Sequence, residues 1–109
     1  MPVQLPDPIE RYIQIENSGT SEVAPECFAA DATVHDEGKT YAGVTAIMNW
    51  MAATKKKYGH TVAPLELAEH GGQIVLKTRL TGNFPGSPAT LNFSFVLASG
   101  KIRSLEIGS

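Results

Sequence analysis

Three titratable residues follow one another at the end of a strand-like stretch: His35, Asp36 and Glu37, with Gly38 directly after them. Apart from Asp31, residues 30–34 before them are small or β-branched, which favours a strand. Successive strand residues point to opposite faces of a sheet. Asp36 is therefore expected to face away from its two titratable neighbours, which disfavours a shared metal site and leaves Asp36 as a candidate for proton chemistry.

Asp36 also has a purely structural interpretation, because an aspartate before a glycine turn often accepts hydrogen bonds from its own backbone. A role in a pocket needs partners from other elements. Tyr12 is the first candidate, since it lies on the apolar face of an expected helix. A tyrosine there is commonly a core residue with its hydroxyl at an edge, and a core that contains a pocket accommodates both interpretations.

The first half of the chain is expected to be helical apart from one short strand pair. Asp7, as the cap, and Pro8 are typical of a helix start, and Gly19 is a typical left-handed helix end. Pro25 is tolerated only near a first turn, so the second helix is expected at 23–29. The remaining elements of this half are a strand at 32–35, a turn at 37–39, a return strand at 40–42 and a third helix at 44–58.

The second half predicts an antiparallel meander. Residues 91–97 alternate between apolar and mostly polar side chains, the period of a strand. The expected strands are 61–69, 73–81, 89–98 and 101–107. This order predicts one α+β domain over residues 1–109, a cone-shaped fold in which three N-terminal helices pack on the concave face of a curved, mostly antiparallel sheet. A dead-end pocket between helices and sheet is the expected ligand site.

The composition and charge of the chain disfavour some classes of binding partner. The net charge is −2, which argues against nucleic acid and against an anionic membrane surface. The basic run 55–57 is interpreted as a solvated helix end. The single cysteine, Cys27, cannot form an internal disulfide, and its apolar neighbours indicate a core position.

The chain shows no signal for a cofactor or for export. It has no glycine-rich phosphate loop and no cysteine–histidine metal spacing, so we expect neither cofactor nor metal. Residues 1–7 lack the basic and apolar regions of a signal peptide, and no apolar run is long enough to span a bilayer. We therefore expect a soluble, cytoplasmic protein.

Three short motifs resemble a known superfamily. They are Arg11-Tyr12-Ile13, then Asp31-Ala32-Thr33-Val34-His35-Asp36, then Gly43 before the third helix. Together with the element order, they resemble the ketosteroid isomerase branch of the nuclear transport factor 2-like superfamily, which also holds the SnoaL-like polyketide cyclases. The resemblance implies that Asp36 is the base that moves a proton beside a carbonyl, and that Tyr12 donates a hydrogen bond to the developing oxyanion.

The chain departs from that family's pattern at two functional positions. Glu37 stands where the isomerases often have proline, which puts a second carboxylate beside the base. The family's second oxyanion donor, an aspartate on a late strand, falls near Asn92 or Phe93, depending on a gap of one residue. Asn92 could donate a hydrogen bond and Phe93 could not. Trp50 and Met51, on the third helix, are further candidates for the pocket lining, with core packing as the alternative.

These observations favour an enzyme that transfers a proton next to a carbonyl of a small apolar molecule, as an isomerase or a cyclase. The alternative is a non-catalytic module of the same fold that binds a small ligand or dimerises. A third hypothesis is hydrolysis by water activated at Asp36, with Glu37 or Arg79 as helper, although strand alternation points both away from the pocket. A homodimer through the outer face of the sheet is expected in each case.

Overall fold

The computed structural model describes residues 4–108 of the 109-residue chain. The elements are α1 (Asp7–Ser18), the 3₁₀ helix η1 (Ser21–Glu26), β1 (Phe28–Asp36), β2 (Lys39–Ala42), α2 (Val44–Tyr58), β3 (Thr61–His70), β4 (Gln73–Thr81), β5 (Ala89–Ala98) and β6 (Lys101–Gly108). The strands form a six-stranded sheet in the order β2-β1-β6-β5-β4-β3. Within the described residues, no helix is both long and apolar enough to cross a membrane.

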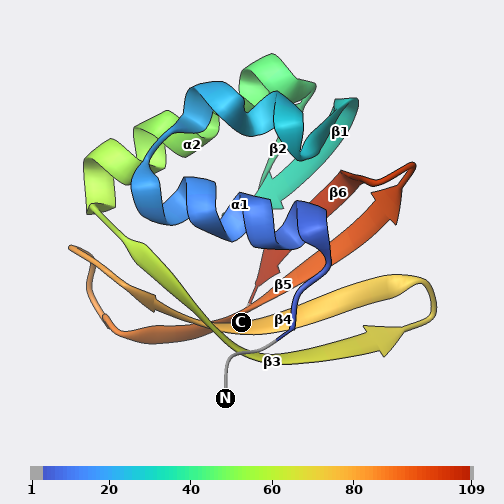
Figure 1. The fold of residues 1–109 in the computed structure, drawn as a ribbon. Coiled ribbons are helices and arrows are strands. Elements are labelled where there is room, and N and C mark those ends of the chain that lie inside the picture. The colour runs from blue at the N-terminus through green and yellow to red at the C-terminus, as the bar shows by residue number, and fades with distance from the viewer. Residues whose placement is uncertain (1–3, 109) are drawn as a thin grey trace.

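The helices lie on the concave side of the curved sheet (Figure 1), which confirms the expected α+β cone. The core between the two layers is centred on Tyr12, whose side chain is fully buried. Its ring lies 5.6 Å from that of Phe28, 6.2 Å from that of Phe93 and 5.7 Å from that of Phe95, measured between centroids. Aromatic side chains of this size bury a large apolar area, so these contacts hold α1 firmly on the sheet.

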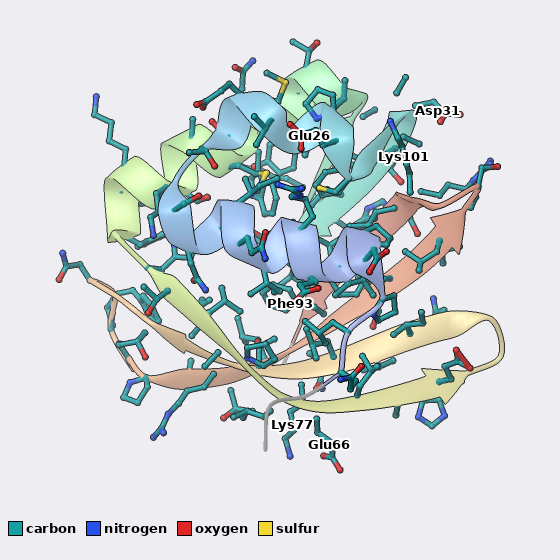
Figure 2. The ribbon with its side chains drawn as sticks, in the orientation of Figure 1. Glu26, Asp31, Glu66, Lys77, Phe93 and Lys101 are labelled. Atoms are coloured by element: carbon teal, nitrogen blue, oxygen red, sulfur yellow. The ribbon has the colours of Figure 1, made fainter. Side chains whose placement is uncertain are left out.

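Strand alternation sets which side chains reach the interior. Phe93 on β5 points toward α1, whereas Lys77 and Glu66, on β4 and β3, lie on the opposite side of the sheet, away from the helices (Figure 2). Asn92 pairs with Lys77 across β4 and β5. Directly paired residues share a face, and both side chains are exposed. Asn92 therefore belongs to the outer face.

The first half differs from expectation in three places. The second helix is a 3₁₀ helix that ends at Glu26, because Pro25 cannot donate the backbone bonds of a longer α-helix. The chain is consequently free to start β1 at Phe28, and β1 pairs in parallel with β6. The N-cap of α1 is Pro6, with no side-chain cap bond, so Asp7 is not the cap. The left-handed end at Gly19, with φ 77°, is confirmed.

A set of polar contacts joins the end of α1 to the start of β3. The Asn17 amide donates to the Val62 carbonyl at 3.0 Å, and the Val62 amide donates to Asn17 Oδ1 at 2.7 Å. Lys55 Nζ donates to the carbonyls of Asn17 and His60. Lys55 thus bridges two backbone segments, which corrects its assignment to a purely solvated helix end. These contacts hold the backbone next to Glu16 and at His60.

Candidate active site

A cavity of about 90 Å³ lies between α1, α2 and the sheet. Its apolar wall comes from strands β4, β5 and β6. Its polar residues come from α1, from α2, from the end of β1 with the residue after it, and from the link between α2 and β3. The lining residues are Glu16, Asp36, Glu37, Trp50, Thr54, Tyr58, His60, Leu80, Leu91, Phe93 and Ile107. Pockets that combine apolar walls with a few convergent polar groups are the usual small-molecule sites.

Asp36 is the last residue of β1, and its carboxyl is half-buried in this cavity. The indole Nε1 of Trp50 donates to Asp36 Oδ2 at 3.1 Å. Burial raises the pKa of Asp36 above its ordinary value of 3.8, and the nearby carboxyls of Glu37 and Glu16 raise it further, against a lowering contribution from the Trp50 hydrogen bond. A carboxyl with these surroundings is better suited to accept a proton near neutral pH than an exposed aspartate.

Glu37 lies at the rim of the same cavity, contrary to the expectation from strand alternation. Its backbone has a positive φ of 53°, which ends the extended conformation of β1. The alternation of faces holds only while the backbone is extended. Glu37 is therefore turned back toward the pocket mouth, where it places a second carboxyl beside Asp36.

Tyr12, Glu16 and His60 form a buried polar chain at the inner end of the cavity. The Tyr12 hydroxyl donates to Glu16 Oε2 at 2.9 Å, and His60 Nε2 lies 3.5 Å from the same oxygen. Burial and the Glu16 carboxyl raise the pKa of Tyr12 well above its usual range. The tyrosine hydroxyl therefore stays protonated and remains a hydrogen-bond donor.

The structure brings together only part of the site expected from the sequence. Asp36, Trp50 and Phe93 line the cavity, whereas Tyr12 lies behind Glu16 and is not part of the lining. Met51 is buried in the hydrophobic core outside the lining. Asn92 is on the exposed outer face, because the inward positions of β5 are held by Phe93 and Phe95.

Sequence reasoning missed Glu16 and His60 as site residues. A signal for Glu16 was present, since it follows Tyr12 by one helical turn and so carries a charge on the apolar face of α1. That glutamate is only 4% exposed. His60 gave no comparable signal, because it directly follows the left-handed end of α2 at Gly59 and resembles an ordinary linker residue.

A larger hollow of about 430 Å³ adjoins the cavity between β2 and α2. The two spaces share Glu37, Trp50, Thr54 and Tyr58 as lining residues. Tyr41 stacks near Trp50 on the side of the larger hollow, with ring centroids 5.8 Å apart. We call the 90 Å³ space the inner cavity and the 430 Å³ space the outer hollow. A ligand too large for the inner cavity could therefore extend past Trp50 into the outer hollow.

Three further residues considered from the sequence do not line the inner cavity. His35 is exposed and its Nδ1 is 2.9 Å from the hydroxyl of Thr40. Arg79 is exposed on β4, as predicted. Cys27 is fully buried, as predicted, and burial raises the pKa of its thiol to about 12. Across residues 4–108, no group of three or more histidine, cysteine, aspartate or glutamate side chains is arranged to hold a metal ion.

The chain matches a known protein family over most of its length. The model of the SnoaL-like domain matches residues 9–104, so the chain belongs to the SnoaL-like domain family. This is the class expected from the fold and from the motifs around Tyr12 and Asp36. A search of curated protein sequences finds no match.

Solved structures show the same fold. A candidate polyketide cyclase from Sinorhizobium meliloti is 39% identical, with a TM-score of 0.89 over 94% of each chain. A protein from Catenulispora acidiphila with a ketosteroid isomerase-like fold, solved in complex with trimethylamine, has a TM-score of 0.83 at 18% identity, over 97% of this chain and 87% of its own. A nuclear transport factor 2-like protein of unknown function from Cytophaga hutchinsonii has a TM-score of 0.76 at 20% identity, over 98% of this chain and 92% of its own.

Proposed function

We propose that this protein is an enzyme that transfers a proton at a carbon beside a carbonyl group of a small, largely apolar molecule. The observation that carries the proposal is Asp36, a half-buried carboxyl that lines an apolar-walled cavity and is oriented by Trp50. The family membership and the likeness to a candidate polyketide cyclase support it.

In the proposed step, the Asp36 carboxylate removes a proton from the carbon next to the carbonyl. The electron pair of the broken C–H bond forms a C=C bond, and the carbonyl π electrons move to oxygen, which gives an enolate and a neutral Asp36. Return of the proton to a different carbon completes an isomerisation. Attack of the enolate carbon on a second carbonyl of the same molecule completes a cyclisation, and Asp36 then gives its proton to the new alkoxide. Neither route needs a redox partner.

The two adjoining spaces set the substrate's size. A cavity of about 90 Å³ is well below the few hundred Å³ typical of a site for a drug-sized ligand. We assign the reacting end of the substrate to the inner cavity and the remainder to the outer hollow of about 430 Å³. Trp50, which lines both, then contacts the substrate at the point between the two parts.

Tyr12 acts indirectly in the proposed site. The hydrogen of its hydroxyl is already donated to Glu16, and the tyrosine does not line the cavity. We therefore assign it to holding Glu16 in place rather than to direct contact with an oxyanion. Asn92 has no role in the proposed site, because its side chain is on the outer face of β5.

The test is exchange of carbon-bound protons in D₂O. A panel of unsaturated ketones and β-keto esters is incubated with the wild-type protein, Asp36→Asn and the matched control Asp31→Asn, and deuterium uptake is followed by NMR. Asp31 is an exposed aspartate on the same strand, outside the cavity. Loss of the base is expected to lower the exchange rate by about a hundredfold or more, and the control should retain the wild-type rate. Equal rates for all three proteins would favour the alternative, a non-catalytic binding module of the same fold.

We further propose a homodimer through the outer face of the sheet. Leu65 on β3 is 46% exposed, and β3 is an edge strand of the sheet, a position that proteins commonly cover. Light scattering should give twice the chain mass, and Leu65→Lys should lower the dimer fraction. A monomer mass at high protein concentration would contradict this assembly.

A further inference from the structure

His60 is a buried polar residue whose hydrogen bonding is incomplete. Its side chain lines the inner cavity, and the residue is 4% exposed. Its Nδ1 atom has no hydrogen-bond partner within residues 4–108. Buried polar atoms almost always have a partner, and leaving one unpaired is costly. Because His60 lines the cavity, a ligand atom is the candidate partner for this buried nitrogen.

The opposite edge of the ring is held in place. His60 Nε2 lies 3.5 Å from Glu16 Oε2, and the Tyr12 hydroxyl donates to that same oxygen at 2.9 Å. The carboxylate oxygen is the acceptor in both contacts, so Nε2 carries a hydrogen. This contact directs the ring, as a carboxylate does for many functional histidines. The remaining nitrogen, Nδ1, is an acceptor in neutral His60 and a donor when both ring nitrogens carry a proton.

The backbone around His60 is held by hydrogen bonds and by close packing. The paired hydrogen bonds between Asn17 and Val62 join the residue after Glu16 to the second residue after His60. Gly82 packs so closely that a Cβ atom at this position would lie 3.0 Å from both Cα and Cβ of His60. Glu16 and His60 are therefore held at a fixed separation before any ligand binds, which is the preorganisation that a polar binding site requires.

We propose that His60, with a proton on both ring nitrogens, donates a hydrogen bond from Nδ1 to the carbonyl oxygen of the substrate, while Asp36 takes the proton from the adjacent carbon. The role of Asp36 rests on the proposed function; the oxygen-binding role of His60 does not. In the form of His60 that carries a proton on both nitrogens, Nε2–H faces the Glu16 carboxylate and Nδ1–H faces the substrate. Negative charge that develops on the oxygen during proton removal is then stabilised by a charged donor in a buried site.

This assignment narrows the substrate class. The buried end of the ligand carries an oxygen that accepts a hydrogen bond, such as a ketone, a β-keto ester or the corresponding enolate, and is not a plain hydrocarbon. Glu16 and Tyr12 are positioning residues in this scheme, because they act through His60. His60 supplies the second polar contact that the expected strand position at Asn92 does not provide.

The test uses 4-fluorophenol, whose ring and oxygen resemble an enol or enolate. The probe is titrated into ¹⁵N-labelled wild-type protein, and the imidazole nitrogens are followed in long-range ¹H–¹⁵N spectra. Nδ1 of His60 is expected to shift as the probe binds, while the nitrogens of His70, which is exposed in the β3–β4 hairpin, should not. This measurement needs no variant, so it stands even where a substitution at position 60 prevents folding.

The second measurement is the affinity of protein variants for 4-fluorophenol. His60→Gln and Glu16→Gln are each expected to weaken phenol binding by about tenfold, the usual effect of losing a hydrogen bond to a charged group. His70→Gln is the matched control and should bind as the wild type does. Asp36→Asn should still bind the phenol while losing proton exchange.

The outcomes distinguish the role of His60 from that of Asp36. Three results would overturn the role of His60: no change in the ¹⁵N shift of its Nδ1 at saturating 4-fluorophenol, unchanged affinity of His60→Gln for this probe, or no binding of the probe at all. Proton exchange that depends on Asp36 but is unaffected by His60→Gln would also overturn it and would leave the proposed function intact. Phenol binding that depends on His60, in a protein without exchange activity, would support the oxygen site and contradict the proposed enzyme.

Discussion

The indole Nε1 of Trp50 donates a hydrogen bond to Oδ2 of Asp36 at 3.1 Å, and so joins α2 to the end of β1. This contact orients the candidate base and stabilises its charged form. It acts against burial and against the neighbouring carboxyls of Glu37 and Glu16, all of which raise the pKa of Asp36. The pKa of Asp36 is therefore set by contributions of opposite sign that substitutions can separate.

Trp50→Phe should raise the pKa of Asp36 further, because it removes the hydrogen bond that favours the carboxylate. A base is active when it is deprotonated, so the acidic limb of the pH–rate profile should move to higher pH. The pKa can be measured directly by NMR titration of the Asp36 carboxyl carbon.

Glu37→Gln provides the opposite change for comparison. It removes a negative charge beside Asp36 and should lower the pKa of that carboxyl, which moves the acidic limb to lower pH. Shifts of the same sign in both variants would contradict the assignment of these two contacts.

Asp36→Asn should stabilise the protein at neutral pH while it abolishes activity. Folding raises the pKa of Asp36 above 3.8, so the folded state binds this proton more tightly than the unfolded chain does. Stability contributed by the protonated carboxyl is present below 3.8 and is lost as the pH rises through the raised pKa. The neutral amide avoids this loss, a common trade-off at active sites.

The measurement is urea unfolding of wild type and Asp36→Asn between pH 3 and pH 8, with Asp31→Asn as the exposed control. The stability difference between wild type and Asp36→Asn should grow in favour of the variant as the pH rises through that window, and then level off. A variant that is less stable at neutral pH than at acidic pH, relative to wild type, would contradict the sign of the pKa shift.

Ala53→Trp should discriminate between substrates by size. Ala53 lines the outer hollow, whereas its neighbour Ala52 does not, and both are exposed on α2. A bulky side chain at position 53 should lower kcat/KM roughly tenfold for substrates that extend beyond the inner cavity, and should leave compact ones nearly unaffected. Ala52→Trp is the matched control, and equal effects of the two substitutions would exclude the outer hollow from substrate binding.

Asn17→Ala should destabilise the fold by about 1–2 kcal/mol, because it removes two hydrogen bonds and leaves the Val62 amide and carbonyl without those partners. Ser18→Ala, one residue along, changes only contacts at the exposed end of α1 and should shift stability by less than about 0.5 kcal/mol. Chemical denaturation measures both. Similar losses in the two variants would show that the link between α1 and β3 carries no special weight.

Much of the fold was predictable because its signals are local. The helix at Val44–Tyr58 and the strands at Gln73–Thr81 and Ala89–Ala98 have the predicted boundaries, since glycines and apolar periodicity mark them. The second helix was not predictable in the same way: the 3₁₀ helix ends at Glu26 and β1 begins at Phe28. Parallel pairing of β1 with β6 joins segments distant in the chain, and no local pattern encodes it.

The sequence by itself determined the family, the α+β cone and Asp36 as the candidate base, because short motifs and side-chain periodicity carry that information. Only the tertiary structure decided how the site is completed. The positive φ of Glu37 turned its side chain to the cavity rim, where strand periodicity no longer applies. Glu16 and His60, far apart in the chain, meet because polar contacts join α1 to β3. Such a pairing depends on how two elements pack, and neither element's own pattern reveals it.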